Sequence, residues 1–302
     1  MIPKTKKIWV DGKFVDWEKA KIHILTHSLH YGGGVFEGIR AYETERGPAV
    51  FRLKEHLKRL FFSSSVLGIK IPFSQKEIEK AIIDLIKINK VKQCYIRPLV
   101  IFGYGVMGLY PKKAPINVII SLWPWKKYLG KNLVKVKISK FIRIHPRSTV
   151  VEAKICGHYV NSILASIEAK KEGFDEALLL DYKGFIAEGP GENIFLVKNK
   201  KIFTPKKGSI LPGITRDTVI TIAKQKLNLK VEEKEITLRE LKNADELFFA
   251  GTAVEISPIV QVERTIISNG KEGEVTKKIR ELYQRIVSGK EPRYLKWLKF
   301  IQ

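Results

Sequence analysis

Turn-forming residues divide the second half of this 302-residue chain into short apolar runs, and this spacing restricts the fold more than any other feature. Between residues 176 and 204 the runs are EALLLD, GFIAE, NIFLV and KIFT, separated by YKG, GPGE and KNK. Runs this short suit strands and cannot hold a helix of ordinary length. We therefore expect a meander of short strands in this part of the chain.

Strand and helix signals also occur on both sides of the meander. Asp11-Gly12 separates two alternating apolar runs, as in a tight hairpin. Ser74 and Glu77 match a capping box at the start of a helix. Further strands are expected at 35–42, 49–53, 93–103, 116–123, 133–144, 246–250 and 256–262, with a hairpin at 268–270. Helices are expected at 53–67, 74–89, 158–171, 216–227 and 275–287.

This order of elements predicts an α+β fold rather than a doubly wound parallel sheet, because strands and helices do not alternate regularly. At roughly 100–200 residues per domain, the length fits two domains. The stretch PWKKYLGKN interrupts the strand pattern. We place an N-terminal domain at 1–123, a linker at 124–133 and a C-terminal domain at 134–302.

The chain is strongly basic, with 55 Lys and Arg against 31 Asp and Glu and a formal charge of +24. Because 44% of the residues are hydrophobic, a disordered polycation is excluded. The basic residues are dispersed, which argues against a nucleic-acid-binding protein and suits small anionic ligands. No apolar run is long enough to cross a bilayer, two cysteines favour the cytoplasm, and the histidines have no metal-site spacing.

Lys154 is the strongest candidate for a reactive side chain. It lies among small and apolar residues, in VEAKICG, where a strand is expected to give way to a helix. Burial disfavours the charged form of an amine and lowers its pKa, as a Schiff-base nucleophile requires. The alternative is a lysine that extends from a loop toward solvent.

Other candidates lie in glycine turns and in one apolar strand. Glu188 precedes Gly189-Pro190-Gly191, so it could pair with a ligand cation or form a surface salt bridge. Ile214 and Thr215 could bind a phosphate at a helix start or simply cap the helix. Arg97 and Tyr95 share one face of a strand, where the arginine needs an anionic partner. The turn FFAGTAVE offers Thr252.

Nine stretches together resemble the fold-type IV aminotransferases that depend on pyridoxal 5'-phosphate (PLP), and among them the branched-chain amino acid aminotransferases. In order they are LHYGGGVFEGIRAY, EHLKRL, YIRP, GVMG, PWKKYLG, EAKICGHYVNSILA, EGPGENIF, LPGITRD and AGTAVEISP. The resemblance implies a small N-terminal α/β domain and a larger C-terminal domain with barrel-like β structure. It also implies transamination between L-leucine, L-isoleucine or L-valine and 2-oxoglutarate by a ping-pong mechanism.

The resemblance further implies the roles of individual residues. Lys154 would hold PLP as a Schiff base and move the proton between the substrate and the cofactor, and Glu188 would pair with the pyridine nitrogen. The phenolate oxygen of PLP would be bound by Tyr159. The phosphate would be bound by Arg59, Ile214, Thr215 and Thr252. The substrate would contact Tyr31, Phe36, Tyr95, Arg97, Met107, Leu109, Trp125, Tyr128, Thr252 and Ala253.

Several of these substrate residues imply an oligomer. Tyr31, Met107 and Leu109 would come from a neighbouring subunit, so a homodimer is the minimal unit and a hexamer an extension of it. D-amino acid aminotransferases share the lysine and the glutamate, and a D-amino acid or promiscuous amine aminotransferase is the alternative function. Cys156 and His158 depart from the usual family pattern, which leaves the preference among substrates open.

Overall fold

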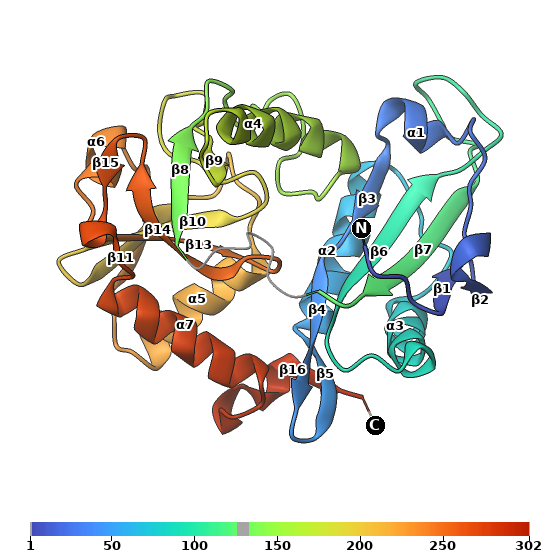
Figure 1. Cartoon of the computed structure of the whole chain (residues 1–302). Coiled ribbons are helices and arrows are strands. Elements are labelled where there is room, and N and C mark those ends of the chain that lie inside the picture. Colours follow the sequence, from blue (N-terminus) through green and yellow to red (C-terminus); the bar gives the residue numbers. More distant parts are fainter. Residues whose placement is uncertain (1, 126–132, 302) are drawn as a thin grey trace. The chain divides into compact units, whose positions relative to one another are not determined.

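The structure is a computed structural model that describes residues 2–125 and 133–301 (Figure 1). The chain forms two compact units. The first unit contains residues 1–126, 153–157 and 286–302, and the second contains residues 127–152 and 158–285. Within the described residues, no helix is both long enough and apolar enough to span a membrane, and no cluster of metal-ligating side chains occurs.

The first unit is built on an antiparallel sheet in the order β16-β5-β4-β6-β7-β1-β2, with β3 paired to β6. The predicted hairpin at Asp11-Gly12 is confirmed, since Trp9 pairs with Phe14 on either side of it. The strands are β1 (Lys7–Val10), β2 (Lys13–Asp16), β3 (Gly34–Phe36), β4 (Ile39–Thr44), β5 (Gly47–Phe51), β6 (Cys94–Phe102), β7 (Ile116–Trp123) and β16 (Leu298–Phe300).

Two long helices pack on this sheet, α2 (Leu53–Val66) on β3 and α3 (Gln75–Asn89) on β1 and β7 (Figure 1). The predicted capping box of α3 is confirmed, because Ser74 accepts from the Glu77 amide and Glu77 accepts from the Ser74 amide. Apolar side chains of both helices and of the sheet form one core. The short helices are α1 (His27–Tyr31), η1 (Trp17–Lys19) and η4 (Pro292–Trp297).

Two stretches outside the predicted N-terminal domain belong to the first unit. The segment 153–157, which contains Lys154, is attached to β3 by a bridge between Val35 and Ile155 and by a hydrogen bond from the Phe36 amide to the Lys154 carbonyl. At the C-terminal end, β16 pairs with β5. Both attachments are long-range backbone pairings, so a linear sequence pattern does not reveal them.

The second unit contains a mixed sheet in the order β12-β11-β10-β13-β14-β8-β9, with β15 paired to β14. The β10–β11 part of the predicted meander is confirmed as an antiparallel pair. The strands are β8 (Val134–Ile138), β9 (Glu176–Leu178), β10 (Asn193–Lys198), β11 (Lys201–Pro205), β12 (Val231–Lys234), β13 (Glu246–Gly251), β14 (Glu255–Val262) and β15 (Thr265–Ile266).

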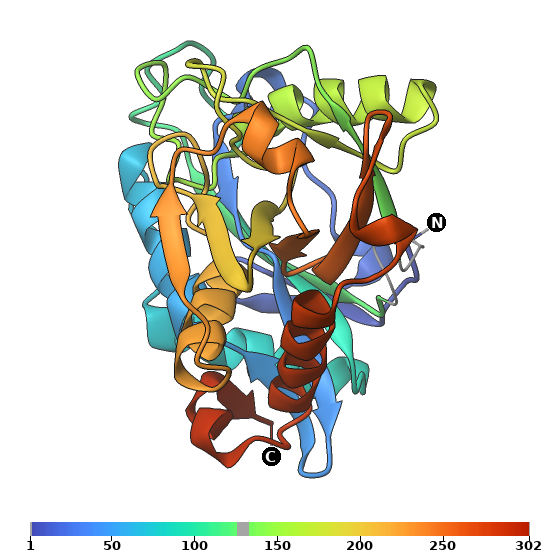
Figure 2. The same cartoon turned by 90° about the vertical axis from the view of Figure 1, so that its left-hand side faces the viewer.

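Helices cover this second sheet at separate places. Helix α4 packs on β8 and β9, while α5 packs on β12 and β13 (Figures 1 and 2). With an antiparallel sheet in one unit, a mixed sheet in the other and helices packed on both, the predicted α+β class is confirmed. The helices are α4 (Tyr159–Lys171), α5 (Ile214–Gln225), α6 (Leu238–Lys242), α7 (Glu274–Val287), η2 (Cys156–His158) and η3 (Ser268–Gly270).

Three local predictions were wrong. The run 35–42 is not one strand but β3 and β4, interrupted at Glu37-Gly38. The run GFIAE forms only isolated bridges, such as Leu180 to Ile186. Residues 268–270 form the short helix η3, and the hairpin turn lies earlier, at Glu263, between β14 and β15.

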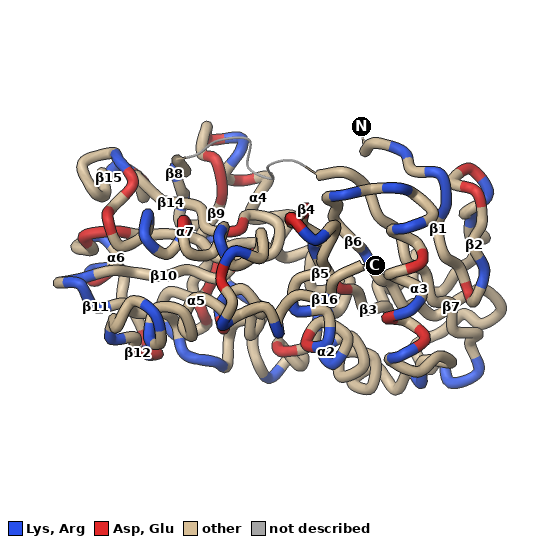
Figure 3. Tube along the Cα trace, turned by 90° about the horizontal axis from the view of Figure 1, so that it is seen from below, with Lys and Arg blue, Asp and Glu red and all other residues tan. Residues whose placement is uncertain are grey.

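Basic residues are dispersed over the structure, as the sequence suggests. Lys and Arg occur along the described trace of both units and are interspersed with Asp and Glu (Figure 3). A nucleic-acid interface normally concentrates basic residues on one face or one helix. The distribution therefore does not favour that alternative function.

Candidate functional site

Lys154 in the first unit has its backbone fixed from two sides. Its amide donates to the Ser63 hydroxyl of α2 at 2.9 Å, and its carbonyl accepts from the Phe36 amide at 3.1 Å. The side chain is half-buried, with Nζ 4.8 Å from the centre of the Phe36 ring. The predicted setting among apolar neighbours is confirmed for Ala153 and Ile155, which are both buried.

This environment changes the acid–base behaviour of Lys154. Burial, followed by the positive charge of Arg59, lowers the pKa of the amine to about 8, although the Glu37 carboxylate opposes the change. A substantial fraction of the amine is then uncharged just above neutral pH. Such an amine can attack a carbonyl carbon, which an ordinary surface lysine does poorly.

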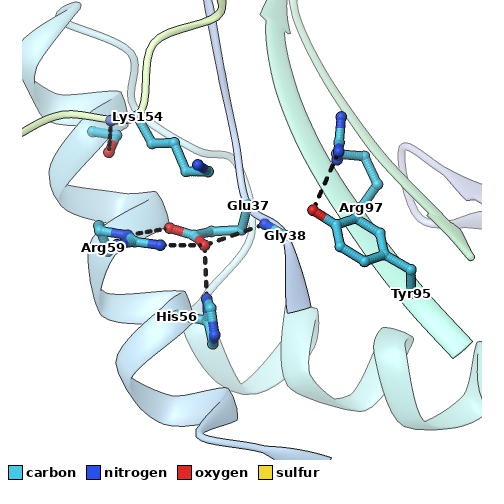
Figure 4. A network of polar contacts seen from close by, with 8 residues as sticks. Glu37, Gly38, His56, Arg59, Tyr95, Arg97 and Lys154 are labelled. Carbon is cyan, nitrogen blue, oxygen red and sulfur yellow. Dashed lines mark hydrogen bonds and ion pairs between the residues drawn. The ribbon is translucent and has the colours of Figure 1, made fainter. Parts of the chain in front are cut away.

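Arg59 and His56 share one face of α2, and both contact Glu37. In Figure 4 they lie below Lys154, which belongs to another segment. Arg59 donates from Nε at 2.6 Å and from Nη2 at 2.9 Å to the two carboxylate oxygens of Glu37. His56 Nδ1 lies 2.7 Å from Glu37 Oε2. Glu37, His56 and Arg59 form one polar network, which we call the Glu37 network, and the charges of Arg59 and Glu37 act on the nearby Lys154 amine.

Arg97 and Tyr95 point from β6 into the same region (Figure 4). Arg97 Nη2 donates to the Tyr95 hydroxyl at 3.3 Å, and the guanidinium lies 4.5 Å from the centre of the Phe36 ring. Arg97 Nε is buried and has no hydrogen-bond partner among the described residues. A buried donor of this kind is costly unless a ligand anion accepts from it. The prediction of a carboxylate-binding arginine therefore fits the geometry.

Gly38 allows Tyr95 to occupy this position. A Cβ atom on Gly38 would lie 1.9 Å from the Tyr95 hydroxyl and 2.8 Å from its Cζ atom. No side chain larger than hydrogen fits there while the tyrosine keeps its place. The Tyr95 ring also packs on Trp125, with 4.7 Å between ring centres. Tyr128, another predicted substrate residue, lies outside the described residues.

Three predicted substrate residues are at the surface of the first unit. Tyr31 is 47% exposed, Met107 is 46% exposed and Leu109 is 86% exposed. His27 brings their segments together, because its ring lies 4.7 Å from that of Tyr31 and its Nε2 is 2.8 Å from the Gly108 carbonyl oxygen. The side chains of Tyr31, Met107 and Leu109 are thus exposed, whereas Phe36 is buried against Lys154 and Arg97.

Glu188 in the second unit is buried, with 4% of the residue exposed. Arg143 Nε donates to it at 2.7 Å and Asn193 Nδ2 at 3.0 Å. The Leu211 amide is 3.1 Å from both carboxylate oxygens. Of the two alternatives for Glu188, the surface salt bridge is therefore wrong, because the pair with Arg143 is buried.

Asn193 links Glu188 to two segments that carry other predicted residues of the second unit. Asn193 also donates to the Leu211 carbonyl, in the segment that leads through Gly213 into α5, where Ile214 and Thr215 begin the helix. Backbone pairing of Asn193 with Ala250 places the Glu188 loop beside the turn after β13, which contains Thr252 and Ala253. Tyr159 starts α4 and is half-buried.

Sequence reasoning missed several polar residues of these clusters. Glu37, within the apolar run VFEGIRAY, carried the same signal as Arg97, a charge where a side chain must be buried. Arg143 and Asn193 carried no local signal, because each is defined by its contact with Glu188. His56 was given no role, because the histidines have no metal-site spacing, whereas it contacts a carboxylate.

Known proteins resemble the chain over its whole length. Residues 34–262 match the class IV aminotransferases. A branched-chain-amino-acid aminotransferase of Pseudomonas aeruginosa is 44% identical over 306 aligned residues, covering 100% of this chain and 99% of that protein. The structure of a branched-chain aminotransferase from Thermoproteus uzoniensis with norvaline has a TM-score of 0.95 and 42% identity, covering 99% of this chain and 100% of that one.

A third relative is the T.th. branched-chain amino acid aminotransferase, with a TM-score of 0.95, 43% identity and 99% coverage of both chains. Its structures include complexes with N-(5'-phosphopyridoxyl)-L-glutamate and with 4-methylvaleric acid. The family predicted from the nine sequence stretches is thus confirmed. This chain belongs to the class IV aminotransferases and, within them, to the branched-chain amino acid aminotransferases.

Proposed function

We propose that the chain catalyses reversible, PLP-dependent transamination between L-leucine, L-isoleucine or L-valine and 2-oxoglutarate. The observation that carries this proposal is the half-buried Lys154, whose pKa is about 8 and whose neighbours supply arginines for anionic groups. The donor set suits PLP, which has an aldehyde for an amine, a phosphate for cationic donors and a ring nitrogen for a carboxylate. The T.th. relative binds a phosphopyridoxyl derivative of glutamate.

The proposed cofactor contacts follow, residue by residue, from the family resemblance. In the first unit, Lys154 would condense with the aldehyde carbon, with loss of water, and Arg59 would bind the phosphate. In the second unit, the helix start at Ile214 and Thr215 and the turn at Thr252 add donors for the phosphate. Glu188 would accept a hydrogen bond from the protonated ring nitrogen, and Tyr159 would donate one to the phenolate oxygen. Each of these roles is a prediction that mutagenesis can test.

The residues of this chain have separate tasks in the reaction. PLP, when bound, withdraws electrons from the substrate Cα and so makes its proton acidic. Lys154 Nζ would take up that proton from Cα and deliver it to C4′ of the cofactor, which needs an amine that changes charge near the working pH. Tyr95 and the backbone of Thr252 and Ala253 hold the substrate carboxylate. Arg97 receives the second carboxylate of glutamate.

Substrate side chains need an apolar wall, and we propose that a second subunit completes it. Phe36, Trp125 and Tyr128 would line one part of the pocket. Tyr31, Met107 and Leu109 would reach the pocket of the neighbouring subunit, which accounts for their exposure in a single chain. A homodimer is then the minimal active unit, and assembly into a hexamer remains a prediction. We also propose that the enzyme acts in the cytoplasm.

The lowered pKa of Lys154 predicts a pH dependence for cofactor attachment. The rate at which PLP becomes covalently attached to the apoenzyme should rise about tenfold per pH unit below pH 8 and level off above it, because only the uncharged amine reacts. Stopped-flow absorbance from pH 6 to 10 measures this rate. A blocked lysine in solution is the control, and its rate should continue to rise toward pH 10. The same continued rise in the protein would contradict a lowered pKa.

A panel of amino donors with 2-oxoglutarate tests the proposed activity. L-leucine, L-isoleucine and L-valine should produce L-glutamate at rates well above that of D-alanine. A higher rate with D-alanine would assign the chain to the D-amino acid or amine aminotransferases instead. Retention on DNA at physiological salt, with no transamination of any donor, would favour the nucleic-acid-binding alternative.

A further inference from the structure

Glu37 is the most completely buried charged residue of the first unit that the proposed reaction does not use. Its exposed fraction is 0%. Four donors surround its carboxylate: Arg59 Nε and Nη2, His56 Nδ1, and the Gly38 amide at 3.3 Å (Figure 4). A carboxylate removed from water needs such a set, because burial without it would cost several kcal/mol.

The charge state of the Glu37 network follows from these contacts. Burial alone would raise the pKa of the Glu37 carboxyl, but the charge of Arg59 and the contact with His56 hold it well below its usual range. Burial lowers the pKa of His56, although Glu37 opposes the change, so the imidazole is neutral at neutral pH. Because an ionised carboxylate only accepts hydrogen bonds, the neutral His56 must carry its proton on Nδ1.

The geometry of the Arg59–Glu37 pair fixes the direction of the guanidinium. Two N–H groups of Arg59, on the Nε–Nη2 edge, meet both oxygens of Glu37. A guanidinium is planar, so a two-point contact along one edge also determines where its other N–H groups point. His56, one turn earlier on α2, prevents the carboxylate from rotating by binding Oε2.

The Glu37 carboxylate is carried by the short interruption between two strands. Strand β3 ends at Phe36 and β4 starts at Ile39, so Glu37 lies in the interruption between them. Its amide donates to the Pro98 carbonyl at 2.9 Å, which holds the interrupted backbone against β6. The carboxylate therefore approaches α2 from a fixed strand end, while Arg59 and His56 come from a packed helix.

We propose that Glu37 is a positioning residue that orients Arg59 for the phosphate group of the cofactor. The inference depends on the proposed function, in which Arg59 binds that phosphate. Glu37 itself makes no contact with the cofactor and acts through the arginine. His56 supports it by holding the second carboxylate oxygen.

A purely electrostatic effect of Glu37 and an orienting effect of Glu37 predict opposite changes in the affinity for phosphate. If only charge mattered, removing the negative Glu37 would strengthen the binding of an anion beside Arg59. If Glu37 orients the guanidinium, its removal weakens phosphate binding, because Arg59 is no longer held in one direction. The sign of the change in affinity therefore distinguishes the two effects.

The test compares three ligands on the apoenzyme of Glu37→Gln and Glu37→Asp. PLP and inorganic phosphate should bind about tenfold more weakly to both variants than to the wild type, measured by absorbance and by calorimetry. Pyridoxal, which lacks the phosphate, should become attached to Lys154 at an unchanged rate at saturating pH. Glu37→Asp keeps the charge but withdraws the carboxylate by one methylene, so it is the variant to use if Glu37→Gln does not fold.

Each other outcome has a definite meaning. Tighter or unchanged phosphate binding in both variants would overturn the positioning role, as would an equal loss for PLP and pyridoxal. Glu43→Gln, an exposed glutamate of β4 paired with Lys92, is the matched control and should bind all three ligands like the wild type. If wild-type apoenzyme binds neither PLP nor phosphate, the proposed function itself fails, which is a different result from a failure confined to the Glu37 variants.

Discussion

Replacement of Lys154 by alanine is expected to reduce the rate of transamination by about four orders of magnitude or more. The amine acts at two points in the proposed reaction, as the attachment site for PLP and as the base that moves the Cα proton. General acid–base catalysis alone contributes about 10²–10⁴-fold, and loss of covalent attachment adds to this. The alanine methyl group offers neither a nucleophile nor a proton carrier.

Two measurements check this expectation. Purified Lys154→Ala should lack the visible absorption of PLP joined to a lysine, and leucine-dependent formation of glutamate should fall to the background of free PLP. Lys58→Ala, which removes an exposed lysine next to Arg59 on α2, is the control and should keep both properties. Full transamination by Lys154→Ala would remove this lysine from the mechanism.

Replacement of Glu188 by glutamine is expected to reduce kcat by about 10²–10³-fold while PLP remains bound. The amide of glutamine is neutral and cannot stabilise a proton on the ring nitrogen, so the electron-withdrawing power of the cofactor falls. The proposed attachment to Lys154 and the proposed phosphate contacts do not involve Glu188. The site also contains Arg143, whose charge would then lack its buried partner, so the thermal midpoint should fall as well.

The Glu188 prediction is checked by separating kinetics from binding. The dissociation constant of PLP should change far less than kcat, and the rate of the half-reaction with L-leucine should carry the loss. Glu232→Gln, at an exposed glutamate of β12, provides the control in the same unit. An unchanged half-reaction in Glu188→Gln would show that the carboxylate serves only to neutralise Arg143.

Local sequence signals predicted the parts of the fold that depend on neighbouring residues. The Asp11-Gly12 hairpin and the Ser74 capping box are examples, since their hydrogen bonds join residues only a few positions apart. The interruption at Glu37-Gly38 was not predicted, because it depends on Pro98 and Lys154, which are distant in sequence. Tertiary pairing overrides the local strand pattern there.

The residues of the candidate site likewise include some with a local sequence signal and some without one. Lys154 and Arg97 could be selected because a charged residue in an apolar run must be accommodated, and the structure shows how each is surrounded. Glu37 belonged to the same class but was interpreted as part of a continuous strand. Arg143 and Asn193 could not be selected, since their significance comes from contacts with Glu188, 45 and 5 residues away.

Helix α2 has a consequence for motion within the first unit. His56, Arg59 and Ser63 recur along one face of this helix, and Ser63 holds the Lys154 backbone while Arg59 is held by Glu37. A displacement of α2 would therefore act on the arginine and on the lysine backbone together. The proposed phosphate-binding group and the proposed reactive amine are therefore both attached to α2, so a substitution that displaces this helix is expected to disturb both together.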